Sequence, residues 1–257
     1  MERTIAILNR KGGVGKTTTA INLGGALNML GKKVLLVDLD PQFNASTILG
    51  FNQGDGPTIF ESLVDKERKT PLPYYEYKEG YDLVPGSGEL DDIESYLPNT
   101  RVGVTKILKK LLSPLKDEYD FIIIDCAPNI GILSVNAMMA ADGVIIPVDR
   151  QLSLEGATDI MAKIEEVREE NENLKIEGFL LTKYKRRINA VTTTKNAIES
   201  FGVPVFNARI RENEELSKMV EYRECVYWYN SHCNGAEDYM QLAREVGKIR
   251  PKSKSSK

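Results

Sequence analysis

The sequence predicts an α/β protein in which helices flank a doubly wound, mainly parallel β-sheet. Several short runs, such as residues 34–37 and 121–124, consist almost only of Val, Ile, Leu and Phe. Strands that are buried on both faces of a parallel sheet have this composition. Helix-length segments separate the runs, and a repeated β-α-β order favours right-handed crossovers between parallel strands. Ligands of such sheets bind at the carboxyl ends of the strands.

The individual elements follow from the alternation of apolar runs and helix-length segments. The apolar runs predict strands at residues 3–8, 33–38, 81–84, 120–125, 143–148, 176–182 and 203–207. The segments between them predict helices near residues 16–30, 88–96, 103–116, 130–140, 153–171, 190–200 and 236–248. Residues 51–80, with their Gly, Pro and Tyr content, are interpreted as an irregular excursion. We expect one domain over residues 1–249 and a basic, disordered tail at 250–257.

The composition is that of an ordinary globular protein. Of the 257 residues, 42% are hydrophobic and 28% are charged, and no apolar run approaches the roughly 18 residues that would span a bilayer. The N-terminus enters a predicted strand at once, without the charged and then apolar pattern of a signal peptide. The three cysteines (Cys126, Cys225 and Cys233) are widely spaced, which fits a reducing cytosol. We therefore expect a cytoplasmic protein that is not bound to a membrane.

A glycine-rich loop follows the first predicted strand and leads into the first predicted helix. Its residues are Lys11, Gly12, Gly13, Val14, Gly15, Lys16, Thr17 and Thr18. Glycines let the backbone bring N–H groups close to phosphate oxygens, and the helix start adds its positive dipole end. In such a loop Lys16 contacts the β- and γ-phosphates, Thr17 binds Mg²⁺, and Thr18 lies near the α-phosphate. The loop predicts a site for ATP and Mg²⁺.

The loop departs from the general pattern G-x-x-x-x-G-K-[ST], because Arg10 replaces the first glycine and a second lysine, Lys11, precedes the others. In this it resembles the deviant Walker A motif of the ParA/MinD superfamily of ATPases. The resemblance continues at residues 136–142, 145–148, 154–156, 180–184 and 235–239, and it favours the Soj-like ParA branch. It implies a P-loop NTPase fold and an ATP-bound homodimer in which Lys11 reaches the partner's phosphates. A cation supplied in this way stabilises charge on the transferred phosphoryl group.

Aspartates follow two of the predicted strands. Asp38 and Asp40 end the second strand and project to the same side if the strand continues through them, although such residues are often only turn formers. The segment resembles the family's second nucleotide motif, which implies that Asp40 orients the attacking water and that Asp38 supports it. Phe43 stands where the family has a glycine. Asp125 ends a buried strand in a Walker B arrangement, in which it holds Mg²⁺ directly or through water.

These motifs together predict Mg²⁺-dependent hydrolysis of ATP to ADP and phosphate. Asp40 would arrange the water, while Lys11 and Lys16 stabilise charge at the γ-phosphate. The resemblance implies that Mg²⁺ is held by Thr17, Asp40 and Asp125, partly through water. It also implies an adenine site at Thr182 and Lys183, where the family's Thr-x-x-Asp segment lacks its aspartate here.

The formal net charge of −3 is divided unevenly along the chain. Residues 1–174 carry 18 basic and 27 acidic groups, a net −9, whereas residues 175–257 carry 16 and 10, a net +6. The basic part is either a solvated surface or a face for a polyanion such as DNA, which clustered Lys and Arg bind with release of counterions. In Soj-like proteins the ATP-bound dimer binds DNA non-specifically through such a face. The resemblance implies the same here, with the candidates Arg187, Arg209, Arg211, Lys218 and Arg223.

The main hypothesis is a ParA-like ATPase for plasmid or chromosome partition. The resemblance implies that ATP builds a sandwich dimer, that the dimer associates with nucleoid DNA, and that a ParB-like partner stimulates hydrolysis and release. The alternative is a positioning ATPase or regulatory switch for a non-DNA cargo, such as a secretion, polysaccharide or conjugation assembly. Salt-dependent binding to arbitrary duplex DNA in ATP but not in ADP separates the two.

Overall fold

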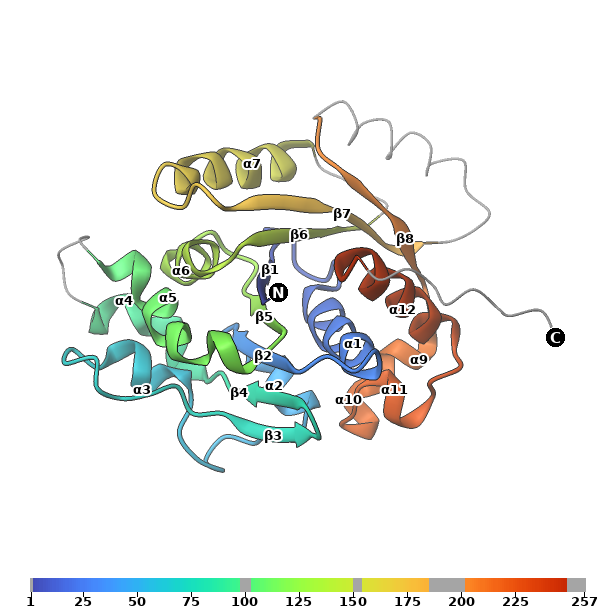
Figure 1. Cartoon of the computed structure of the whole chain (residues 1–257), viewed down its shortest axis with the longest axis horizontal. Coiled ribbons are helices and arrows are strands. Elements are labelled where there is room, and N and C mark those ends of the chain that lie inside the picture. Colours follow the sequence, from blue (N-terminus) through green and yellow to red (C-terminus); the bar gives the residue numbers. More distant parts are fainter. Residues whose placement is uncertain (1, 98–102, 150–153, 185–201, 249–257) are drawn as a thin grey trace.

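The computed structural model describes residues 2–97, 103–149, 154–184 and 202–248, which form an eight-stranded sheet with helices on both faces (Figure 1). The strands follow the order β3-β4-β2-β5-β1-β6-β7-β8 across the sheet. Their bounds are β1 Arg3–Ile7, β2 Val34–Leu39, β3 Tyr75–Lys78, β4 Tyr81–Val84, β5 Phe121–Cys126, β6 Gly143–Val148, β7 Lys175–Tyr184 and β8 Val205–Arg211. Every pair is parallel except β3 with β4. The predicted doubly wound, mainly parallel α/β fold is confirmed.

The helices lie in the connections between the strands and, from α9 onward, after the last strand. They are α1 Lys16–Met29, α2 Asn44–Ile48, α3 Ile59–Val64, α4 Ile93–Tyr96, α5 Ile107–Leu112, α6 Ile132–Ala140, α7 Leu154–Arg168, α9 Glu214–Ser217, α10 Met219–Tyr222, α11 Val226–Tyr229 and α12 Asn234–Val246. The helix expected at 103–116 is divided, because 3-10 turns at Val104–Lys106 and Ser113–Glu118 flank α5. The helix expected at 190–200 and the tail at 250–257 lie outside the described residues. Within the described ranges, no helix combines the length and apolar character that crossing a membrane requires.

Alternate side chains of the central strands enter two apolar layers. Ile5 and Ile7 of β1 belong to the layer that α1 and α12 cover. Ala6, between them, belongs to the opposite layer, which α5, α6 and α7 cover. Every residue of β2, β5 and β6 is buried. Because both faces of these strands are covered, their sequences are apolar, apart from Asp38 and Asp125 near the carboxyl ends, instead of alternating.

The pairing register aligns the carboxyl ends of the central strands. Ile7 of β1 pairs with Asp125 of β5, and Asp125 pairs on its other side with Asp38 of β2. Ile145 of β6 lies opposite Ile7. The loops that follow these strands therefore start next to one another, at the edge where open α/β sheets bind ligands.

The segment 51–80, expected to be irregular, contains a helix and a strand. Thr58 and Glu61 form a capping box at the start of α3, since the Thr58 hydroxyl accepts from the N–H of Phe60 and the Glu61 carboxylate accepts from the N–H of Thr58. β3 then pairs antiparallel with β4 and becomes an edge strand. The expectation was wrong here because α3 and β3 are too short to show a repeating pattern of hydrophobic residues. The Thr-x-x-Glu spacing at residues 58–61 was nevertheless a signal for the start of a helix.

The other edge of the sheet is covered by a helix. α12 packs against β8 (Figure 1), and two of its carboxylates accept hydrogen bonds from backbone N–H groups of that strand. Glu245 accepts from Asn207 at 2.9 Å and from Ala208 at 2.7 Å, and Asp238 accepts from Arg211 at 2.8 Å. An uncovered edge would offer these donors to other chains. The C-terminal region is thereby fixed to the sheet.

Candidate nucleotide site

The loop between β1 and α1 has the geometry of a phosphate cradle. Gly13 and Gly15 have φ angles of +72° and +90°, which favour glycine. Apart from the adjacent residues, no atom of the described chain lies within 4 Å of the point that a Cβ would occupy at Gly12 or Gly13. Gly15 is the N-cap of α1, so no side chain caps the first turn. The buried side chain of Val14 anchors the loop from inside. Open N–H groups at a helix N-terminus fit a phosphate anion.

Two side chains outside the loop hold its backbone in place. The amide of Asn9 donates to the carbonyl of Pro147 at 2.6 Å, and its oxygen accepts from the N–H of Lys11 at 2.9 Å. The hydroxyl of Thr182, in β7, donates to the carbonyl of Val14 at 2.8 Å. Thr182, expected beside the adenine base, is thus buried against the phosphate loop. Asn9 was not predicted, although a polar residue directly after a buried strand was a signal for it.

The two lysines of the loop occupy different environments. Lys16 is buried, and burial lowers its pKa, an effect that Asp125 and Asp40 oppose. Its Nζ lies 3.4 Å from the carbonyl oxygen of Lys11. Lys11 itself is exposed, and its Nζ lies 2.9 Å and 3.0 Å from the carboxylate oxygens of Asp149, which follows β6. One lysine is therefore enclosed in the cradle, and the other stands at its rim.

Asp125 is a fully buried carboxylate at the end of β5. Among the described residues, neither of its oxygens accepts a well-formed hydrogen bond, although the Thr17 hydroxyl is close. Burial, followed by the charge of Asp38, raises the pKa of Asp125 well above its usual value, and Thr17 and Lys16 oppose the shift. A buried anion without donors is costly, and a divalent cation would compensate it.

The donor set around Asp125 fits Mg²⁺. In the described ranges, no three His, Cys, Asp or Glu side chains are grouped to hold a metal by themselves. Mg²⁺ usually binds one or two protein oxygens and completes its shell with phosphate oxygens and waters. The carboxylate of Asp125 and the nearby hydroxyl of Thr17 are such a partial set. The metal would therefore bind together with the nucleotide.

Asp40 stands in the turn that follows β2. It is 7% exposed, and its carboxylate accepts from the N–H of Gln42 at 3.0 Å. Its carbonyl accepts from the N–H of Phe43 at 2.8 Å, which closes the turn. Phe43, the N-cap of α2, has a φ angle of +39°, in the left-handed region that favours glycine. The phenylalanine thus adopts the conformation for which a glycine at this position is suited, and Asp40 stays close enough to Lys16 to act on its pKa.

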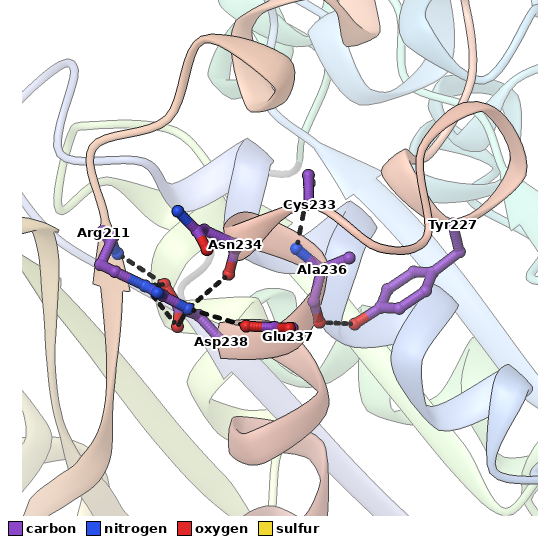
Figure 2. A network of polar contacts seen from close by, with 7 residues as sticks. All are labelled: Arg211, Tyr227, Cys233, Asn234, Ala236, Glu237 and Asp238. Carbon is purple, nitrogen blue, oxygen red and sulfur yellow. Dashed lines mark hydrogen bonds and ion pairs between the residues drawn. The ribbon is translucent and has the colours of Figure 1, made fainter.

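The proposed DNA contact Arg211 lies in a network of polar contacts at the start of α12 (Figure 2). Its guanidinium donates from Nε to Asp238 at 2.9 Å and from Nη2 at 2.7 Å, and it pairs with Glu237 at 3.2 Å. The same Nη2 donates to the carbonyl of Asn234. Hydrogen bonds to Asp238 raise the pKa of Arg211 further. This side chain joins β8 to α12 through its Nε and Nη2 atoms.

The other described candidates also have intramolecular partners. Lys218 pairs with Glu215 at 2.6 Å, Arg223 donates to Asn52 at 2.8 Å, and the guanidinium of Arg209 lies 5.6 Å from the ring centre of Tyr184. Arg187 lies outside the described residues. Lys183, expected near the base, is exposed and has a φ angle of +51°. The structure therefore groups the phosphate and magnesium candidates at one edge and spreads the basic candidates over several elements.

Comparisons with known proteins agree with this geometry. A family model described as an AAA domain matches residues 2–176. The chromosome partitioning protein ParA of Caulobacter vibrioides (strain NA1000 / CB15N) is 40% identical over 257 residues, which cover 95% of this chain and 93% of that protein. The sporulation initiation inhibitor protein Soj of Bacillus subtilis (strain 168) is 38% identical over 250 residues, which cover 96% and 98%.

A solved structure shares the fold and contains Mg-ADP. The septum site-determining protein MinD of Pyrococcus horikoshii OT3, complexed with Mg-ADP, matches this chain with a TM-score of 0.78 at 27% identity, and 97% of each chain is covered. A glycine cradle, an enclosed lysine and a buried carboxylate without donors are the parts that a P-loop site with Mg²⁺ requires. The chain belongs to the ParA/Soj family of P-loop ATPases, which hydrolyse ATP with Mg²⁺ as cofactor.

Proposed function

We propose that this ATPase is a partition protein. ATP joins two copies into a sandwich dimer, the dimer binds DNA without sequence preference, and hydrolysis drives plasmid or chromosome partition. The observation that carries the proposal is the contrast between the two lysines of one loop. Lys16 is enclosed, whereas Lys11 is exposed at the rim in an ion pair with Asp149 that solvent screens. The partition role in the name of the Caulobacter relative supports the same conclusion.

The groups at the sheet edge have separate tasks in this proposal. The loop N–H groups and Lys16 hold the β- and γ-phosphates, and Thr18 lies near the α-phosphate. Thr17 and Asp125 hold Mg²⁺, which neutralises charge on the phosphates. Asp40 orients the attacking water, directly or with a metal-bound water. Thr182 supports the loop, so its contribution to nucleotide binding is indirect.

Lys11 would act on the second subunit. An exposed cation at the rim of one cradle is placed to approach the phosphates in the facing cradle when two copies meet across ATP. Because ATP would then be part of the interface, binding of nucleotide and dimerisation would be coupled. We therefore expect Lys11→Ala to bind ATP as a monomer.

The DNA-binding face would lie in the basic C-terminal part of the chain. Residues 175–257 carry the net charge of +6, which favours a polyanion. Cations that already pair with carboxylates gain less from a phosphate, because they must exchange one anion for another. Among the described candidates, Arg209 and Arg223 are therefore better placed than Arg211 and Lys218, and Arg187 stays a candidate on its charge alone.

A ParB-like activator would act beside the phosphate loop. A cavity of about 560 Å³ is lined by Arg10, by Asn129 in the loop after β5, and by residues of α7 such as Lys163. Because Arg10 directly precedes the phosphate loop, a segment of a partner in this cavity would lie beside that loop. We further propose that residues 1–249 form the single catalytic domain, and that the protein is cytoplasmic and associates with the nucleoid when ATP is bound.

The decisive test measures binding to arbitrary duplex DNA by fluorescence anisotropy. We expect binding in Mg-ATP that weakens steeply as salt rises, and none in Mg-ADP. Light scattering after size-exclusion chromatography would show dimers in ATP, with Lys11→Ala as the monomeric control. ATP-dependent dimers that fail to bind DNA even at low salt would refute the partition role and favour a positioning ATPase or regulatory switch for a non-DNA cargo.

A further inference from the structure

Asp38 is the centre of a buried hydrogen-bond network behind the turn that carries Asp40. Its side chain is 0% exposed. One carboxylate oxygen, Oδ1, accepts from the backbone N–H of Asp40 at 3.2 Å. The other, Oδ2, accepts from the N–H of Ser46 at 2.8 Å and from its hydroxyl at 2.6 Å. Asp38 therefore attaches the backbone of Asp40 to α2.

Ser46 extends the network to the neighbouring strand. The single hydrogen of its hydroxyl is donated to Asp38, and its Oγ accepts from the N–H of Gly86, which follows β4, at 3.0 Å. A Cβ at Gly86 would lie 2.9 Å from the carbonyl oxygen of Asp38, so only glycine permits this approach. β2 and β4 are adjacent in the sheet. The network thus joins two strand ends and one helix to the turn of Asp40.

We propose that Ser46 is a positioning residue for ATP hydrolysis, which fixes the place of Asp40 through the carboxylate of Asp38. The inference rests on the catalytic role proposed for Asp40. The N–H of Gly86, the hydroxyl of Ser46 and the carboxylate of Asp38 form a chain of hydrogen bonds that strengthen one another in a water-free interior. The Ser46 hydroxyl therefore fixes the orientation of the carboxylate that accepts the N–H of Asp40. Without it, Oδ2 of Asp38 keeps one of its two donors, and the carboxylate has more freedom to rotate.

Loss of the Ser46 hydroxyl should lower the rate of ATP hydrolysis and leave the affinity for ATP unchanged. A catalytic group must be held within about 0.5 Å of its productive position, so a small displacement of Asp40 lowers the rate. The phosphate cradle has its own supports, Asn9 in the loop after β1 and Thr182 in β7. ATP binding should therefore be independent of Ser46.

The test compares Ser46→Ala with Thr47→Ala in the full chain. Ser46→Ala should lower kcat about 10-fold, the effect of one buried hydrogen bond, and leave the Kd for ATP within about 2-fold. Thr47→Ala removes a hydroxyl from the next, exposed residue of the same helix and should change neither value. An unchanged kcat in Ser46→Ala, or a loss of ATP affinity equal to the loss of kcat, would overturn the proposal.

Amide hydrogen exchange in Mg-ADP gives a readout that a general loss of stability would not reproduce. In Ser46→Ala the amide of Asp40 should exchange faster, while the amides of residues 11–18 keep their protection. Equal loss of protection in both segments would mean that Ser46 only stabilises the fold. Asp40→Ala in the same turnover assay separates the catalytic role of Asp40 from the positioning role of Ser46. If Asp40→Ala retains full activity, the catalytic role of Asp40 is wrong. If Asp40→Ala is inactive while Ser46→Ala is unaffected, only the positioning role of Ser46 is wrong.

Discussion

The nucleotide edge of the sheet and the basic C-terminal region both carry charged side chains, but their charges are compensated differently. At the nucleotide edge, Asp125 is buried without a well-formed hydrogen bond from the described residues, and α1 begins without a side-chain cap. In the C-terminal region, Arg211 is held by Asp238 and Lys218 by Glu215. Buried polar groups without partners are rare and costly, so an unpartnered carboxylate at a strand end beside a phosphate loop is a candidate ligand position. Arg211 and Lys218 already have partners within the chain.

Lys16→Ala should produce the largest change at the nucleotide edge. Lys16 is an enclosed cation near Asp125 and Asp40, and its removal leaves phosphate charge uncompensated. We expect ATP affinity to fall about 100-fold or more. Isothermal titration with Mg-ATP measures this, and Lys11→Ala, which removes the exposed lysine of the same loop, should lose only the part of the affinity that dimerisation contributes. Unchanged affinity in Lys16→Ala would contradict the assignment of the phosphate loop.

Asp40→Ala should affect turnover almost alone. Asp40 is placed by the turn after β2 and not by the phosphate loop, so the cradle and its open N–H groups remain. We expect phosphate release to fall about 100-fold or more, the contribution of a group that orients or activates the nucleophile. Light scattering should still detect dimers in ATP. Persistent turnover would show that another group arranges the water.

Arg211→Ala tests whether the C-terminal cations serve the fold. The variant leaves Asp238, whose side chain is 9% exposed, without its guanidinium partner. We expect the free energy of unfolding to fall by about 1–3 kcal/mol, reduced from a fully buried pair because the arginine is partly exposed. Urea denaturation measures this value. Arg223→Ala, at an exposed residue, should cost about 0.5 kcal/mol or less, and equal losses would remove the distinction between the two arginines.

The sequence predicts those parts of the fold and the site that are encoded locally. The phosphate loop is one, because a strand, a glycine turn and a helix start meet within residues 3–18. Asp125 is another, since it ends an apolar run. Ser46 and Gly86 could not be predicted, because their hydrogen bond joins residues 40 positions apart, and the sequence carries no sign of that distance.

Charge is predictable from the sequence, but the partner of a charge is not. Arg211 is expected on a DNA-binding face because the sequence shows a basic region. Asp238, which binds it, lies 27 residues away on another element. Short elements are missed for a related reason, since β3 has four residues and its position depends on pairing with β4. Local motifs therefore locate a ligand site better than net charge locates a binding face.

Asp125→Asn should change the free energy of unfolding by a smaller amount. It tests whether an unpartnered buried carboxylate indicates a ligand site. Without nucleotide or Mg²⁺, the amide is easier to bury than a carboxylate, so the variant should be more stable by about 1 kcal/mol while losing turnover. Burial raises the pKa of Asp125, so the folded protein retains its proton at low pH and loses stability as the pH rises through that pKa. The advantage of the variant should therefore grow as the pH rises above the usual pKa of an aspartate, about 3.9, as measured by urea denaturation in EDTA. If Asp125→Asn is less stable than the unmodified protein at high pH, the carboxylate of Asp125 is already compensated within the chain without a ligand. Its burial would then not indicate a metal site.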